Sequence, residues 1–247
     1  MAVVASTQGD ALGRLVVVNW AVEALGLVRA LQELGATDLV LVGTSAPEEV
    51  EASLSGVRER GELRYLRASV GDGVESFAEF LAREVEVGAA HSVIVLPHRG
   101  RGETDAFSRL TCTAIHRACR GQPPRVVVAV EDPEATHEFA GLGVATIFYP
   151  GFLRAALLAH ACVDLGVLRF MFALLRGKLR VQSWPLPAGL RARSFRDACM
   201  TVESDAEGRP VTVLGVFTPE AGMLVNPGPA HPLATTTALL VLTGQDA

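Results

Sequence analysis

The chain has 247 residues, enough for one main domain and a smaller appended unit. Hydrophobic residues make up 49% of the chain and aromatic residues 6%, which excludes a disordered chain and favours an aliphatic, closely packed α/β protein. The formal net charge of -5 and the scattered basic residues argue against a nucleic-acid-binding protein.

The first 150 residues alternate short aliphatic runs with amphipathic stretches, as in a parallel sheet wrapped by helices. The near-continuous apolarity of each run predicts burial on both faces. Six strands are predicted, at Leu15–Val18, Asp38–Val42, Leu63–Leu66, Ser92–Leu96, Arg125–Val130 and Val144–Phe148. Helices are expected between them, near 21–34, 47–58, 73–87, 104–120 and 133–141. Residues 1–150 are therefore predicted to form a Rossmann-like, doubly wound parallel sheet.

The turn after the first strand lacks the glycines of a dinucleotide-binding fingerprint. It begins with Asn19-Trp20, whereas glycines normally let the backbone approach a pyrophosphate there. The acid that holds ribose hydroxyls after the second strand is absent too, because Val42 is followed by Gly43-Thr44-Ser45. Both absences argue against NAD binding. Trp20 either stacks on a ligand base or plugs the emptied cleft.

Charged residues follow the fourth and fifth strands, at the edge where open α/β sheets bind ligands. Arg99 and Arg101, next to His98, are candidates for holding an anion, with a solvated loop before the next helix as the alternative. Asp105, at the start of that helix, is a ligand candidate or a helix cap.

The fifth strand ends at a second pair of acidic candidates. Glu131 and Asp132 could bind a cation through carboxylate oxygens, or Asp132 could cap the helix that begins at Pro133.

Residues 151–177 are predicted to form two apolar helices, about 151–165 and 167–176, with Gly166 turning the chain between them. This stretch is long enough for a bilayer, but it carries charges such as Arg154 and Asp164, which favour an interface helix pair over a membrane span. The side chains expected at such an interface are Phe152, Leu157, Leu158, Leu168 and Phe172.

Residues 178–247 are predicted to form a small α+β domain with one helix near 194–202. Its strands are expected at Leu179–Pro185, Val211–Phe217, Met223–Val225 and Ala238–Leu242.

The remaining signals for chemistry or targeting are weak. The four cysteines form no CxxC pair and show no metal-type spacing with the histidines, so they are expected to be free, buried thiols in a reducing cytoplasm. No GxSxG elbow or other arrangement for nucleophilic catalysis is evident, and the first residues do not resemble a signal peptide.

Several segments, in order along residues 12–243, resemble the RCK family, the regulators of potassium conductance also called KTN or TrkA-type domains. The segments are VVVNW at 16–20, HSVIVLP at 91–97, RVVVAVEDPEATHEFAGLGVATIFYPG at 125–151, LPAGLRARSFRDA at 186–198 and GVFTPEAGMLVNP at 215–227. Asn19-Trp20 is similar to the Gly-Trp-Asn variant of some bacterial RCK channels and of the Castor and Pollux ion channels.

The resemblance implies a non-catalytic, cytoplasmic, ligand-sensing domain of a potassium channel or transporter. It implies a dimer through the 151–177 helix pair, and a tetrameric or octameric gating ring held at the inner face of the membrane by a pore partner. The ligands implied are NAD(H), adenine nucleotides, cyclic dinucleotides, or cations such as calcium and sodium. Two alternatives stay open: a degenerate copy with a purely structural role in the ring, and an NAD-dependent oxidoreductase.

Overall fold

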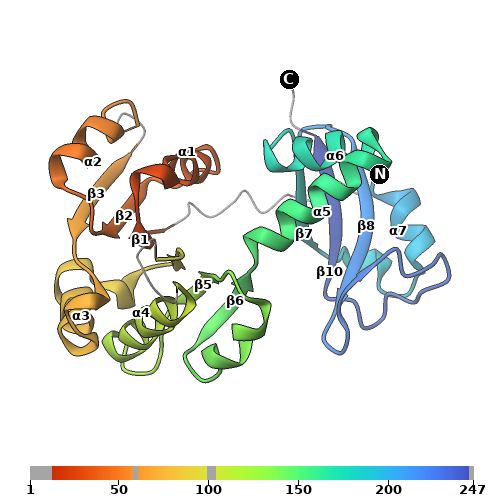
Figure 1. Cartoon of the computed structure of the whole chain (residues 1–247). Coiled ribbons are helices and arrows are strands. Elements are labelled where there is room, and N and C mark those ends of the chain that lie inside the picture. Colours follow the sequence, from red (N-terminus) through yellow and green to blue (C-terminus); the bar gives the residue numbers. More distant parts are fainter. Residues whose placement is uncertain (1–12, 58–60, 99–103, 245–247) are drawn as a thin grey trace. The chain divides into compact units, whose positions relative to one another are not determined.

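The computed structural model describes residues 13–57, 61–98 and 104–244 (Figure 1). The described residues divide into two compact units, one that ends at Leu157 and one that begins at Leu158.

The N-terminal unit is built on a six-stranded sheet in which every neighbouring pair is parallel. Its strands are β1 (Leu15–Trp20), β2 (Asp38–Gly43), β3 (Glu62–Arg67), β4 (Ser92–Val95), β5 (Arg125–Ala129) and β6 (Val144–Phe148). The order is β3-β2-β1-β4-β5-β6, which is the Rossmann order with its switch of direction between β1 and β4. All six predicted strands and the Rossmann-like fold are confirmed.

Helices cover both faces of this sheet, as Figure 1 shows. They are α1 (Leu25–Glu33), α2 (Pro47–Leu54), α3 (Val74–Phe80) and α4 (Thr104–Ala118), with short 3-10 helices at Val70–Asp72 and Val87–Ala89. Alternate side chains of β1 enter different cores: Val17 packs in the cluster with α1 and α2, and Val16 packs in the cluster with α3 and α4. The sheet is therefore buried on both sides, which explains its continuous apolar runs.

Three helical predictions are corrected in type. The segment expected to be a helix at 133–141 is a 3-10 helix, Pro133–Phe139, in which the Thr136 hydroxyl donates to the carbonyl of Pro133 and so competes with regular α-helical bonding. Helix α3 continues as a π-helical turn, Leu81–Val85, and ends at Glu86, whose φ is 54°. Helix α1 is preceded by a 3-10 turn, Val22–Ala24.

The predicted apolar pair is α5 (Pro150–Val163) and α6 (Leu165–Leu175). The chain turns at Asp164 rather than at Gly166, because the Asp164 carboxylate caps α6 by accepting the Gly166 N–H at 2.6 Å. No residue of either helix is buried in the chain. Within the described part of the chain, no helix combines the length and apolarity needed to cross a membrane.

The C-terminal unit contains an antiparallel sheet of order β7-β10-β8-β9. Its elements are β7 (Leu179–Pro185), a 3-10 helix (Ala188–Leu190), α7 (Phe195–Thr201), β8 (Val211–Thr218), β9 (Gly222–Val225) and β10 (Ala238–Gly244). A capping box starts α7: Ser194 Oγ accepts the Asp197 N–H, and the Asp197 carboxylate accepts the Ser194 N–H. Trp184 and Leu239 lie in the core between α7 and the sheet.

Asp205 makes this unit sensitive to acid. Its carboxylate is 2% exposed and accepts N–H groups of Glu207 and Arg209, together with the Arg209 guanidinium at 2.6 Å. Burial acts to raise the pKa of Asp205, but the hydrogen bonds and charge of Arg209 hold it below the ordinary value of 3.8. Near that pH the unfolded chain binds more protons than the folded chain, so stability is present above it and is lost as the pH falls toward the lowered pKa.

We therefore expect the urea midpoint of the C-terminal unit to fall below about pH 4, and Asp205→Asn to flatten this dependence while lowering stability at neutral pH. The measurement uses a Trp20→Phe background, which leaves Trp184 as the only tryptophan. Parallel pH profiles for the two proteins would contradict the assignment.

Candidate functional site

A cavity of about 630 Å³ opens at the carboxyl edge of the parallel sheet, where the strand order switches between β1 and β4. Four segments line it: the β1–α1 turn with Asn19, Ala21 and Ala24, the end of β4 with Leu96 and Pro97, the end of β5 with Glu131, and the first turns of α5 with Pro150, Gly151 and Arg154. This volume lies within the range of small-molecule sites, about 300–1,000 Å³.

Asn19 shapes the turn in place of a glycine. Its φ is 60°, a left-handed conformation that asparagine tolerates better than most residues, and the β1–β2 register shifts at this position. Its amide nitrogen donates to the carbonyl of Leu96 at 3.1 Å and lies 3.4 Å from the Thr111 hydroxyl. Asn19 therefore ties β1 to the end of β4 and to α4.

Trp20 belongs to β1 rather than to the turn, because it pairs with Gly43 of β2. Its side chain is 1% exposed and packs edge-to-face on Tyr65 at 5.8 Å, within the core beneath α1 and α2. Any side chain at position 43 would collide with the Trp20 carbonyl oxygen, which explains the glycine that follows Val42. The indole offers no open face on which a base could stack.

A second, smaller pocket of about 190 Å³ lies on the β2 side of the same turn. It is lined by His98 and by polar residues that include Thr44, Ser45, Glu23 and Glu49. The His98 ring stacks on Phe107 of α4, with 4.6 Å between the ring centroids. Arg99 and Arg101, proposed from the sequence as anion ligands, lie outside the described residues.

The three acidic candidates have separate positions. Asp105, in the first turn of α4, accepts the backbone N–H groups of Glu131 at 3.0 Å and Asp132 at 2.8 Å. Asp132 accepts the Glu134 N–H at 2.9 Å as the cap of the 3-10 helix that starts at Pro133. Of these three residues, Glu131 alone lines the larger cavity. Asp105 and Asp132 thus hold the β5 loop, and Glu131 is available to a ligand.

Loss of the hydrogen bonds between the Asp105 carboxylate and the backbone of Glu131 and Asp132 should destabilise the loop that contains Glu131. We expect Asp105→Ala to lower the free energy of unfolding by about 1.5–3 kcal/mol, because hydrogen bonds to a charged acceptor are lost. Asp105→Asn should cost less, since one acceptor oxygen remains. Urea denaturation followed by circular dichroism measures the stability of both variants. Equal stabilities of Asp105→Ala and the wild type would contradict a stabilising role of these hydrogen bonds.

The sequence interpretation did not identify Arg154 or the start of α5 as part of the site. Tyr149-Pro150-Gly151 directly follows the sixth strand at the ligand-binding edge. The Tyr149 hydroxyl contacts the Thr136 hydroxyl and the Pro133 carbonyl, which anchors the entry to α5 beside the β5 loop. A charged residue one turn after a strand end was the signal that could have indicated this position.

The described residues also bear on metal binding and on thiol chemistry. Among residues 13–57, 61–98 and 104–244, no group of three or more His, Cys, Asp or Glu side chains could hold a metal ion. Cys112 is 1% exposed, and burial raises the pKa of its thiol to about 12, which disfavours the reactive thiolate at neutral pH.

No protein-family model matches the chain, and no curated protein matches it either. Among solved structures it is similar to the GsuK channel bound to NAD, with 14% identity and a TM-score of 0.43 over 97% of this chain and 37% of the channel chain. It is also similar to the NAD(P)-binding domain of an exopolyphosphatase-related protein from Archaeoglobus fulgidus, with 18% identity and a TM-score of 0.44 over 62% of this chain and 99% of that one.

NAD+-bound xylitol dehydrogenase is similar at 18% identity and a TM-score of 0.34, over 66% of this chain and 68% of the dehydrogenase. The chain thus spans just over a third of the length of the channel that it matches. At these identities and TM-scores, neither the channel nor the dehydrogenase determines what this chain does.

Proposed function

We propose that this chain is a non-catalytic, ligand-sensing regulatory domain of a potassium channel or transporter, which acts in a ring of copies beside a pore. The RCK-like segments along the sequence support the potassium-transport context. The observation that carries the sensing role is the position of α5: its first turns line the 630 Å³ cavity, and the rest of its length is apolar and not buried.

Helix α5 can connect a bound ligand to subunit contacts. Pro150, Gly151 and Arg154 line the cavity, whereas Leu158 and Val163 further along the same helix are 64% and 85% exposed. A helix is stiff along its axis, so a ligand that moves the first turn also displaces the remaining turns. Such a ligand regulates a pore only where its affinity differs between the open and closed arrangements.

The exposed apolar side chains of α5 and α6 favour a buried surface in an assembly. Phe152 is 72% exposed and Phe172 is 42% exposed, while Leu157 and Leu168 are partly exposed. Soluble chains rarely leave contiguous apolar patches uncovered unless another chain binds them. We therefore assign these residues to a dimer interface, with Phe152, Leu157, Leu158, Leu168 and Phe172 as its core.

Ligand sensing is tested by thermal unfolding in the presence of a panel of compounds. The panel contains NAD(H), ATP, ADP, cyclic dinucleotides, calcium, sodium and small charged metabolites. We expect at least one compound to raise the melting temperature, since a ligand at 100 times its Kd stabilises the folded chain by about 2.7 kcal/mol. Ala24→Phe, which places a ring in the cavity, should abolish the shift.

The matched control is Ala52→Phe, an exposed position on α2 far along the chain from the cavity residues. It should keep the ligand-induced shift. If no compound of the panel raises the melting temperature of the wild type, the ligand-sensing role is overturned and the purely structural role in a ring is left. Reduction or oxidation of a substrate coupled to NAD(H) would instead support the oxidoreductase.

A further inference from the structure

We propose that the 630 Å³ cavity takes a small zwitterion with an apolar body, of the size of an amino acid or a short peptide, rather than a dinucleotide. This inference rests on the ligand-sensing role proposed above and specifies the chemistry of the ligand. It is carried by two opposite charges that have no ion-pair partner among the described residues and that line the cavity beside several apolar residues.

Glu131 and Arg154 supply the two charges. Both residues line the cavity, Glu131 at the end of β5 and Arg154 on α5. Within the described ranges neither one forms an ion pair, either with the other or with a third residue. A ligand ammonium can therefore bind the Glu131 carboxylate while a ligand carboxylate binds the Arg154 guanidinium, in charge-assisted hydrogen bonds.

Further polar contact comes from Asn19. Both of its hydrogen bonds use the amide nitrogen, so its amide oxygen has no partner among the residues that the structure describes and can accept from the same ammonium. The neighbouring wall is apolar, formed by Ala21, Ala24 and Leu96 among others. A hydrophobic side chain of the ligand fits this part of the cavity.

A dinucleotide fits the crevice poorly. It would have to cross the β1–α1 turn and place a nucleoside on the β2 side, but the pocket there measures about 190 Å³, below the usual range of ligand sites. Gly43 supplies no acid for the ribose, and the Tyr65 hydroxyl already donates to the Ser45 carbonyl at 2.9 Å. These features favour a ligand that occupies the larger cavity alone.

Isothermal titration calorimetry on the full chain tests the ligand class. The probes are zwitterions of increasing charge separation, L-leucine, Leu-Leu and Leu-Leu-Leu, with the N-acetyl and C-terminal amide derivative of each, and NAD. We expect at least one zwitterion to bind and both of its singly charged derivatives to bind about tenfold more weakly or worse, because each leaves one protein charge unpaired. NAD should bind more weakly than that zwitterion.

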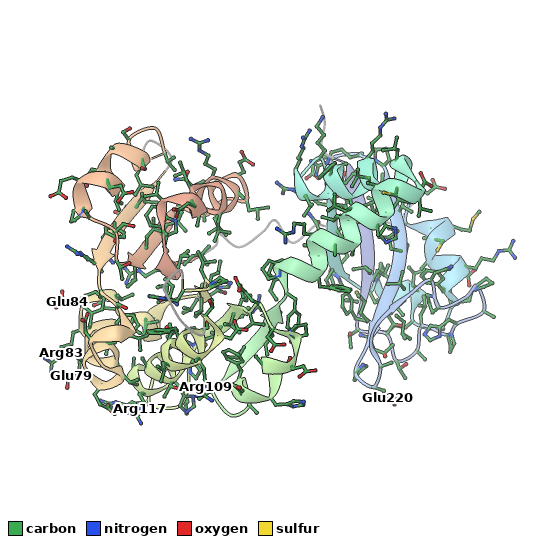
Figure 2. The ribbon with its side chains drawn as sticks, in the orientation of Figure 1. Glu79, Arg83, Glu84, Arg109, Arg117 and Glu220 are labelled. Atoms are coloured by element: carbon green, nitrogen blue, oxygen red, sulfur yellow. The ribbon has the colours of Figure 1, made fainter. Side chains whose placement is uncertain are left out.

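The variants assign each charge. In Glu131→Gln the preference for the zwitterion over its N-acetyl derivative should disappear, and in Arg154→Gln the preference over its amide should disappear. The matched controls, Glu79→Gln and Arg83→Gln, change exposed residues of α3 and the turn after it, labelled on the outer surface in Figure 2, and should keep both preferences.

Three results would overturn the inference. Equal binding of a zwitterion and its derivatives would remove the role of the two charges. Binding of nucleotides or ions without any zwitterion would reject the ligand class and leave the sensing role standing. If no probe binds in calorimetry and no compound of the thermal panel shifts the melting temperature, both the zwitterion inference and the ligand-sensing role are rejected.

Discussion

Replacement of Trp20 by alanine should lower the free energy of unfolding of the N-terminal unit by about 3–5 kcal/mol. The indole is 1% exposed and fills the core between the sheet and the helices α1 and α2, where it packs on Tyr65. Its truncation therefore leaves a large cavity beside β1 and β2. Urea denaturation followed by circular dichroism measures the change.

Trp20→Phe separates packing from hydrogen bonding. The Trp20 indole N–H is buried and has no hydrogen-bond partner among the described residues. Phenylalanine removes this unpaired donor and keeps an aromatic ring against Tyr65, so this variant should lose much less stability than Trp20→Ala. If Trp20 instead served as a stacking surface for a ligand, Trp20→Ala would unfold like the wild type and change only binding. That result would reject its assignment to the core.

The strands of this protein could be predicted because their sequence signal is local. Runs such as Val16–Val18 and Val40–Val42 face a core on each side of the sheet, so every position of the strand is apolar. Whether a helical segment forms an α-helix or a 3-10 helix depends less on the local sequence. Residues 133–139 have a helix start at Asp132-Pro133, but the Thr136 hydroxyl takes part in the bonding and the segment forms a 3-10 helix.

The candidate site could be predicted only in part, because it depends on which chain segments meet. The sequence placed Asn19 and Glu131 at the ligand-binding edge, and both line the cavity. It could not show that the Asp105 carboxylate bonds the backbone of Glu131, since the two residues are 26 positions apart. It also could not show that Arg154, within an apolar helix, reaches the same cavity.

The replacement of Leu157 and Phe172 by aspartate should convert a dimer into a monomer. Both residues lie on the helices α5 and α6, which have no buried residue within the chain. A charge placed in the middle of an apolar interface must be desolvated without a partner, so the two changes together should weaken association on the order of a thousandfold. Multi-angle light scattering over a concentration series measures the loss.

The interface can be located by the cysteine that it should cover. The predicted burial of the cysteines is wrong for two of them: Cys162 of α5 and Cys199 of α7 are exposed, whereas Cys112 is buried in the N-terminal core. Peptide mass analysis therefore follows the labelling of Cys162 separately from that of Cys199. A thiol reagent should modify Cys162 slowly in the dimeric wild type and rapidly in the double variant, because dissociation uncovers α5. The control Glu220→Lys changes a residue that Figure 2 labels at the hairpin between β8 and β9, and it should leave both the mass and the labelling rate unchanged. A wild-type chain that is monomeric at every concentration would contradict the dimer interface on α5 and α6.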